Sequence, residues 1–425
     1  MRLSKQVIRK WVLIILLFLD LSGFYMIVFP SAINSYIRFN KAFLAVLAII
    51  IFIFFINRNL ISNNISSFLH NYIIVLCFSL LCLIGLTAIS NPGQKMITFF
   101  IGCSPYLLMF FSLYFIEIMI RDGNTDDFFK YFNIIAFVWY ILLIIQSYQY
   151  NYNGSLFMLT SQTNERILTR DSGIRLGIGT VGNLMILYNF HIIIQKHRKA
   201  LINIILFAMG IYCAFMIQQT RMYNIAIIIS LAMIYISAGK ITSKRITRIC
   251  FIAVVLVFFL NSQIAQSFFD SFSVTGDSGN NTLVRLKSIN YYMSIFYKSP
   301  IFGFGLTSNE KVYSGGGLYD LTDVGFIGLL AQSGLFSIIL FIIPVIRLIY
   351  ILKESNKAKN RVVNYPLMVG LCVFVITTAG SLIITNQDRA MIIPIIMALF
   401  EYEYGKYKMG FVGTKVSNMK LNHIF

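Results

Sequence analysis

Arginine side chains recur at the ends of the long apolar runs of this sequence. The connections 218–221 and 386–389 are both short, and both end on an arginine. A guanidinium group can bind two phosphate oxygens at once, so several arginines around one cavity would suit a diphosphate. A single arginine at a helix end can instead reach the lipid headgroups. The basic residues concerned are Arg166, Arg170, Arg175, Arg221, Arg285, Lys287 and Arg389.

Glycines and carboxylates form a second group further along the chain. In the run Ser-Pro-Ile-Phe-Gly-Phe-Gly-Leu (299–306), Gly303 and Gly305 permit positive φ and a close approach of the backbone. Asp320 and Asp323 precede the next apolar run. A carboxylate there can accept a proton from a substrate hydroxyl, or it can cap the start of a helix. The spacing leaves both roles open.

Tyrosines extend this group. Tyr291, Tyr292 and Tyr297 lie at helix-like spacing in the stretch 282–298, which also carries Arg285. We expect a short amphipathic helix there, on the membrane surface or over a cavity. Its tyrosines could stack on the faces of sugars, although tyrosine also anchors proteins at membrane interfaces.

Membrane-spanning helices must position these residues. Of the 425 residues, 58% are hydrophobic and 12% are charged, whereas soluble domains carry about 25% charged residues. Apolar runs of spanning length recur from end to end, which excludes a soluble domain with one anchor. The 35 Lys and Arg residues against 16 Asp and Glu indicate basic cytoplasmic loops. No basic segment outside the apolar runs is interleaved with aromatic residues, so nucleic acid is not an expected partner.

The sequence therefore predicts an all-α, polytopic membrane protein that forms one integral membrane domain over 1–425. Asp20 lies near the middle of the first span, where a charge is costly and a functional role is the default hypothesis. A neutral carboxyl group hydrogen-bonded to another helix is the alternative. The twelve expected spans are roughly 11–29, 42–56, 72–89, 97–120, 129–147, 175–194, 200–218, 223–238, 247–265, 323–350, 365–385 and 390–404.

The placement of lysine and arginine predicts the orientation. With a cytoplasmic N-terminus, the basic connections 196–199, 240–248 and 347–361 fall on the cytoplasmic side, as does the tail. Both termini are then cytoplasmic. The long loops 148–174 and 266–322, the latter between spans nine and ten, face outward. Loops of this length are uncommon unless they are functional or disordered.

The order of these features resembles the O-antigen ligase/polymerase family, of the Wzy and WaaL type. The run 299–306 is similar to the P-x-x-G-x-G turn in the family's large outer loop. The segment 170–175, followed by Asn183, is similar to its earlier arginine-bearing segment, and 219–221 is similar to its S-R or T-R element. The resemblance covers roughly residues 165–335.

This resemblance implies a polysaccharide polymerase of the bacterial cytoplasmic (inner) membrane, without a cofactor or metal. Donor and acceptor would be oligosaccharide repeat units linked to polyprenyl (undecaprenyl) diphosphate. They would be joined on the outer face into capsule, O-antigen or another exopolysaccharide. Arginines would stabilise the leaving diphosphate, and a carboxylate would act as general base. A chain-length regulator and a flippase are expected as further partners besides membrane lipid.

The expected site residues combine the resemblance with their placement on the outer side. The expected catalytic residues are Asp323 as the first choice for the base, Asp320 as the second, and Arg221 for the diphosphate. The expected substrate-binding residues are Arg170, Arg175, Arg285, Arg389, Gly303, Gly305 and Tyr291.

Two other functions remain as alternatives. Ligase members of the family carry a histidine in the outer loop, whereas the four histidines of this chain fall on the expected cytoplasmic side; this favours a polymerase over a glycan ligase. A flippase for lipid-linked oligosaccharides is the main rival. Such a transporter typically shows internal repeats and several buried charges, and this sequence shows no visible repeat and one clear acid within a span.

Overall fold

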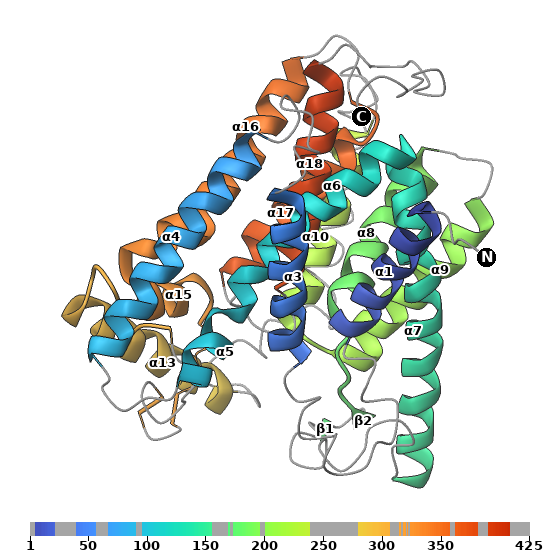
Figure 1. The fold of residues 1–425 in the computed structure, drawn as a ribbon. Helices are drawn as coiled ribbons and strands as arrows, with labels where there is room; N and C mark the ends of the chain where they lie inside the picture. Colours follow the sequence, from blue (N-terminus) through green and yellow to red (C-terminus); the bar gives the residue numbers. More distant parts are fainter. Residues whose placement is uncertain are drawn as a thin grey trace.

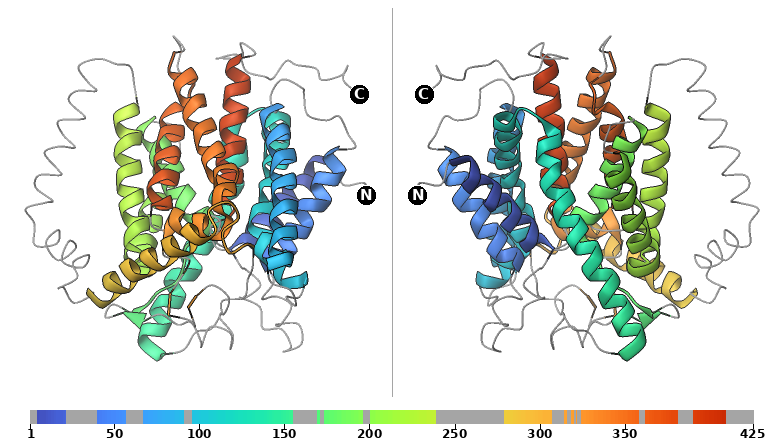
Figure 2. Two further views of the ribbon diagram at one scale, coloured as in Figure 1. Left: turned by 90° about the vertical axis from the view of Figure 1, so that its left-hand side faces the viewer. Right: turned by 90° about the vertical axis from the view of Figure 1, so that its right-hand side faces the viewer.

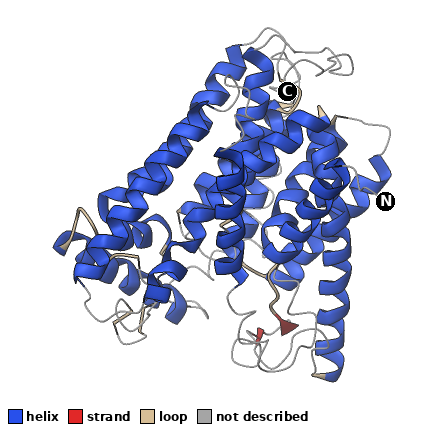
Figure 3. Ribbon diagram, in the orientation of Figure 1, coloured by secondary structure: helices blue, strands red, loops and turns tan. Residues whose placement is uncertain are grey.

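The chain folds as a bundle of helices that run up and down between two ends (Figure 1). Figure 3 shows helix almost throughout the described chain, with one short pair of strands, so the predicted all-α class is confirmed. The structure, a computed structural model, describes residues 5–21, 40–56, 67–90, 96–154, 169–170, 173–195, 200–238, 279–306, 314–315, 318–319, 321, 324–357, 362–380 and 390–408.

The first part of the chain forms helices from apolar runs that glycine and asparagine interrupt. The elements are α1 (Lys5–Asp20), α3 (Asn40–Ile56), α4 (Ser67–Ser90), α5 (Met96–Leu107), a 3-10 turn (Leu108–Phe110), α6 (Phe111–Asp122) and α7 (Thr125–Asn153). Gly123, with φ 67°, ends α6, and the Asn124 side chain caps α7 by accepting from the Asp126 amide at 3.0 Å. Gly154, with φ 66°, ends α7.

The rest of the chain adds a hairpin and further helices. The elements are β1 (Thr169–Arg170), β2 (Gly173–Ile174), α8 (Gly179–Ile194), α9 (Ala200–Tyr212), a π-helix (Cys213–Gln218), α10 (Arg221–Ser237), α13 (Gly279–Lys298), α15 (Gly325–Ser333), a 3-10 turn (Gly334–Phe336), a second π-helix (Ile338–Ile342), α16 (Ile343–Lys357), α17 (Tyr365–Ala379) and α18 (Ile392–Lys408). The strands β1 and β2 pair antiparallel, with Thr169 opposite Ile174.

Four described helices are long and apolar enough to cross a membrane: Phe68–Ile89, Thr98–Arg121, Thr125–Asn153 and Leu201–Gln218. A fifth span results if the bent pair Gly325–Phe336 and Ile338–Lys357 is counted as one. Shorter apolar helices lie at Phe43–Ile53, Gly179–Ile194, Arg221–Ser237 and Tyr365–Ala379. The expected span 247–265 and the second half of 11–29 lie outside the described residues.

The outer surface of the bundle is apolar, as a lipid environment requires. On α4, Ile74, Phe78 and Leu81 are exposed, and on α9 Leu201 and Ile202 are exposed. A soluble protein rarely leaves so many large apolar side chains open in neighbouring turns. The interior is a continuous apolar core to which helices from all parts of the chain contribute.

The bundle has two ends that differ in composition. One end carries the β1–β2 hairpin and the C-terminal end of α7, and α13 also lies toward it (Figures 1 and 2). We call it the hairpin end. The opposite end carries the junction of α6 with α7 and the C-terminal ends of α16 and α18. A small second core, formed by Tyr292, Leu321, Val324 and Ala331, joins α13 to α15.

Three features differ from the sequence-based expectations. The expected span 323–350 is not one helix, because α15 and the helix that follows it are bent by 115° at the break. Asp20 is the last residue of α1, although the sequence placed it near the middle of a span. The loop expected at 148–174 contributes its first residues to α7 and its last to the hairpin.

Candidate functional site

Arg175 joins the hairpin to the helix break between α9 and α10. Its Nε donates to the carbonyl of Gln218 at 3.3 Å, and its Nη2 donates to the Thr220 hydroxyl at 3.2 Å. The next amide along, that of Leu176, donates to the carbonyl of Ile217 at 3.3 Å. The chain leaving β2 is therefore tied to the end of the π-helix by side-chain and backbone hydrogen bonds.

The break itself has an uncommon backbone. The π-helix Cys213–Gln218 is closed by the amide of Gln219, which donates to the carbonyl of Ala214 at 3.1 Å. Gln219 has φ 49° and is the one residue with positive φ, other than glycine, in the described part of the chain. Single-turn π segments and left-handed non-glycine residues both concentrate at functional sites.

Arg221 opens α10 directly after this break. The Thr220 hydroxyl caps none of the first-turn amides of α10; it accepts from Arg175 and donates to the carbonyl of Gln218 at 3.3 Å. The amides at a helix start carry partial positive charge and bind anions readily. Arg175, Gln218, Gln219, Thr220 and Arg221, which we call the Arg175 group, thus combine two guanidinium groups with a helix N-terminus.

The glycine turn predicted at 299–306 forms a second group. Gly303 and Gly305 both have positive φ, 62° and 92°, as expected from the sequence. The amides of Phe304 and Gly305 donate to the carbonyls of Ala331 and Gln332, each at 2.9 Å. The amide of Leu335 donates back to Pro300 at 2.9 Å. We call this set of backbone bonds between 300–305 and 331–335 the clasp.

The clasp explains why both glycines are needed. A Cβ on Gly303 would collide with the carbonyl oxygen of Ala331, and one on Gly305 would collide with the Thr87 side chain. The Thr87 hydroxyl in turn accepts from the amide of Leu306 at 3.1 Å, and Tyr106 donates to the Gln332 side chain at 3.1 Å. The clasp therefore fastens the break between α15 and α16 to α4 and α5.

Tyr291 packs against the small core that joins α13 to α15. Its ring stacks on that of Tyr319 with centroids 4.3 Å apart, and it meets Tyr292 edge-on at 5.3 Å. The Tyr292 hydroxyl donates to the carbonyl of Tyr319 at 3.2 Å. Helix α13 covers the expected amphipathic stretch 282–298 and also carries the half-buried Arg285.

Five of the ten predicted site residues are thus found in two described groups, and Arg285 lies apart from both on α13. Arg175 and Arg221 belong to the Arg175 group, whereas Gly303, Gly305 and Tyr291 belong to the clasp and its small core. Helix α17 contacts both α10, which begins in the first group, and α15, which belongs to the second. The side chain of Arg170 and all of Asp320, Asp323 and Arg389 lie outside the described residues. The sequence reasoning missed Thr87, Tyr106 and Gln332, and only Gln332, an amide in an apolar helix, gave a local signal.

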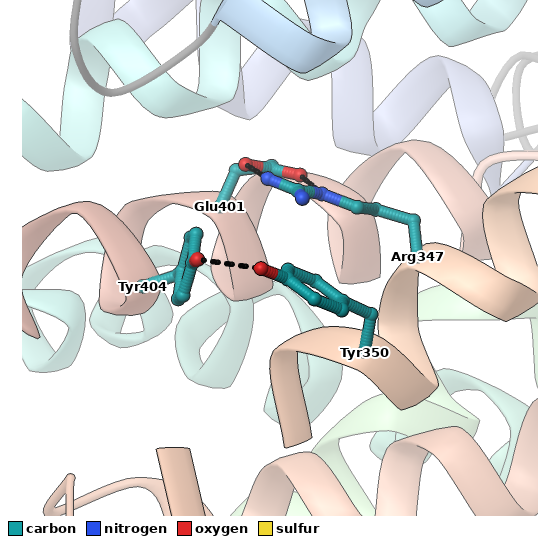
Figure 4. A network of polar contacts seen from close by, with 4 residues as sticks. All are labelled: Arg347, Tyr350, Glu401 and Tyr404. Atoms are coloured by element: carbon teal, nitrogen blue, oxygen red, sulfur yellow. Dashed lines mark hydrogen bonds and ion pairs between the residues drawn. The ribbon is translucent and has the colours of Figure 1, made fainter. Parts of the chain in front are cut away.

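A third polar cluster lies at the opposite end of the bundle (Figure 4). Arg347 donates to both carboxylate oxygens of Glu401, at 2.6 and 3.0 Å, and its guanidinium lies over the rings of Phe68, Tyr350 and Tyr404. The hydroxyls of Tyr350 and Tyr404 are 3.4 Å apart. These groups satisfy one another, so the cluster connects α16, α18 and α4 and is best explained as structural.

Acidic residues at that end are also paired. The Asn364 side chain donates to both Thr125 and Glu403 at 2.7 Å, and Glu117 pairs with Arg121 at 2.6 Å. Asp126 lies in the first turn of α7 and accepts a hydrogen bond from the Tyr188 hydroxyl at 3.2 Å. Within the described residues, no three His, Cys, Asp or Glu side chains are grouped as metal ligands would be.

Comparison with known proteins adds no relative. No protein-family model matches the chain, and no curated protein sequence matches it significantly.

Proposed function

We propose that this protein is a polysaccharide polymerase that joins oligosaccharide repeat units linked to polyprenyl diphosphate on the outer face of a bacterial cytoplasmic membrane. The proposal includes the twelve-span topology with both termini in the cytoplasm and a large outer loop between spans nine and ten. It draws on the resemblance of residues 165–335 to the O-antigen ligase/polymerase family. The hairpin end would then face outward.

The observation that carries the proposal is the Arg175 group. Arg175 donates a hydrogen bond to Thr220, the residue that precedes Arg221, so both arginines lie near the start of α10. Two guanidinium groups and the first amides of a helix can hold the oxygens of a diphosphate and stabilise it as it leaves. A carboxylate would accept the proton of the attacking sugar hydroxyl; Asp323 and Asp320 are the sequence-based candidates.

Substitution of the two arginines tests the proposal. We expect Arg175→Ala and Arg221→Ala each to lower polymer synthesis by roughly 100-fold or more, the usual effect of removing a group that stabilises developing negative charge. Glycan chain length would be measured on cells, with membrane levels of each variant checked. Lys353→Ala is the matched control, since Lys353 is exposed on α16 at the opposite end.

The fate of the single repeat unit distinguishes the functions. Accumulation of single lipid-linked repeats on the outer face supports the polymerase. If long chains still form in both arginine variants, the proposal is wrong. If long chains form but are no longer transferred to their final acceptor, the protein is a glycan ligase.

A flippase for lipid-linked oligosaccharides is the second candidate. The 115° bend between α15 and the helix after it favours this function, because transporters build their sites from discontinuous helices. Accumulation of repeats on the cytoplasmic face in the arginine variants would identify a flippase.

A further inference from the structure

Tyr140 lies near the middle of α7, where that helix meets α8 and α9 (Figure 1). Its side chain is fully buried, and its hydroxyl donates to the carbonyl of Gly182 on α8 at 2.6 Å. Phe128 and Phe132, on the same helix, fill buried positions without a hydroxyl. The carbonyl of Gly182 lies within α8, where an amide four residues further on also bonds to it. The Tyr140 hydroxyl therefore joins two helices and is not needed to complete α8.

Glycines let α8 and α9 come close to this side chain. A Cβ on Gly182 would lie 3.2 Å from the Tyr140 ring. A Cβ on Gly210, in α9, would lie 2.9 Å from the Tyr140 hydroxyl oxygen and 2.6 Å from Cγ1 of Ile186 on α8. Both distances are shorter than an ordinary van der Waals contact, so α9 can pack this closely only with glycine at 210. Tyr140 thus packs against α9 three residues before the π-helix begins at Cys213.

The π-helix is held at both of its ends. At its start, the buried Cys213 thiol donates a weak hydrogen bond to the backbone carbonyl of Tyr140 at 3.9 Å. At its end, the carbonyl of Gln218 accepts from Nε of Arg175 at 3.3 Å. Helix α7 also contacts the π-helix directly. The π-helix therefore connects Tyr140 to the Arg175 group.

The π register determines which backbone groups face Arg175. A π turn holds one residue more than an α turn, so the residues after it are displaced by one position, about 100° around the helix axis, from their places in a continuous α-helix. In a continuous α-helix, the Gln218 carbonyl would be turned away from the side on which Arg175 now bonds to it. The contacts of Tyr140 with Gly210 and Cys213 fix the start of the segment, and the π register then brings Gln218 to Arg175.

We infer that Tyr140 is a positioning residue for the diphosphate-binding arginines, an inference that rests on the proposed function. It acts through the π-helix and does not itself contact the substrate. Its hydroxyl and ring hold α8, α9 and the start of the π-helix together while Arg175 and Arg221 stabilise the leaving diphosphate. The sequence placed Tyr140 within the expected span 129–147 and assigned it no role.

A double-mutant cycle in the full chain tests this role. The protein would be placed in lipid bilayers and supplied with polyprenyl-diphosphate-linked repeat units from cells that lack it. We expect Tyr140→Phe to lower the polymerisation rate per folded molecule by roughly 10- to 100-fold, the scale of effect of displacing a catalytic group by about 1 Å. The thermal midpoint should change little, because the variant loses one hydrogen bond and keeps the ring. In the Arg175→Ala chain, Tyr140→Phe should lower the rate no further, because residues that act as one unit are not additive.

Tyr114→Phe is the matched control. Tyr114 on α6 is buried, and its hydroxyl donates to the carbonyl of Arg9 on α1 at 2.8 Å, so the control loses the same kind of bond between helices. We expect this variant to keep the parent rate. A purely structural role for Tyr140 would lower the thermal midpoint or the membrane level, as in the control, and would leave the rate per folded molecule unchanged.

The outcomes separate two kinds of failure. If Arg175→Ala lowers the rate and Tyr140→Phe does not, or if the two losses multiply, only this inference is wrong. If Arg175→Ala keeps the parent rate, the proposed function fails as well. If Tyr140→Phe does not accumulate in membranes, Cys213→Ala takes its place in the cycle. A loss that disappears beside Arg175→Ala then supports the inference, and a loss that persists there, or no loss at all, overturns it.

Discussion

The arginines at the two ends of the bundle have different described hydrogen-bond partners. At the opposite end, Arg347 and the almost fully buried Glu401 form a bidentate ion pair (Figure 4). At the hairpin end, Arg175 donates to the neutral oxygens of Gln218 and Thr220.

Removing Glu401 from its ion pair with Arg347 should destabilise the folded protein. We expect Glu401→Ala to lower the free energy of unfolding by about 2–3 kcal/mol, less than the loss for a fully buried pair, because the half-buried Arg347 then keeps its charge without its carboxylate. The thermal midpoint of the purified protein in bilayers would report the change. Glu354→Ala is the control, because Glu354 pairs with the exposed Lys357 at 2.7 Å. Equal midpoints for the two variants would show that the buried pair contributes no more than the exposed one.

At the scale of elements, the clasp holds the C-terminal end of α15 against the glycine turn at 300–305. The turn 300–305 exchanges backbone hydrogen bonds with the C-terminal end of α15 and the 3-10 turn that follows it, 331–335, where the bent helix would otherwise leave amides and carbonyls without partners. Within a membrane such a break is stable only when protein groups satisfy the backbone. The glycine turn therefore closes the break as well as bordering the candidate site.

Substitution within the clasp should disrupt it. We expect Gly303→Ala to cost more than about 2 kcal/mol, because the left-handed backbone disfavours alanine and the new methyl group meets the Ala331 carbonyl. The thermal midpoint and the yield of monodisperse protein would measure the loss. Gly85→Ala serves as control, since a Cβ at Gly85 in α4 meets nothing within 4 Å. An unchanged midpoint for Gly303→Ala would mean that the clasp can shift freely.

The sequence predicted the helices and the glycine turn better than their breaks. Apolar runs identify helices, and glycine spacing identified Gly303 and Gly305 as positions of positive φ. The 115° bend depends on bonds between residues about thirty positions apart, which no local pattern contains. The π-helix before Gln219 likewise leaves no mark in residue types. The meeting of Arg175 with Thr220 was inferred only as convergence of arginines, and its geometry required the tertiary structure.

At the scale of the whole molecule, cysteine labelling can test on which side of the membrane the hairpin end and the opposite end lie. We expect Tyr152→Cys and Lys298→Cys, both at exposed positions toward the hairpin end, to react with an impermeant maleimide on intact cells. Lys353→Cys and Lys408→Cys should react only after the cells are opened, because the positive-inside rule places their end in the cytoplasm. The parent chain gives the background from its own cysteines. The reverse labelling pattern would invert the topology and place the Arg175 group inside the cell.

The length of α7 ties the depth of the site to the thickness of the membrane. Its 29 residues make a rod of about 44 Å, against about 30 Å for a typical hydrocarbon core. The Tyr140 hydroxyl bonds this rod to the Gly182 carbonyl of α8 at 2.6 Å, and α7 also contacts β2. We therefore expect the hairpin and Arg175 to keep a fixed position relative to α7. In a bilayer of shorter acyl chains the arginines would stand farther above the level of the lipid phosphates, and in one of longer chains they would sink toward it. The position of the arginines relative to the lipid phosphates should therefore depend on the acyl-chain length of the surrounding lipids.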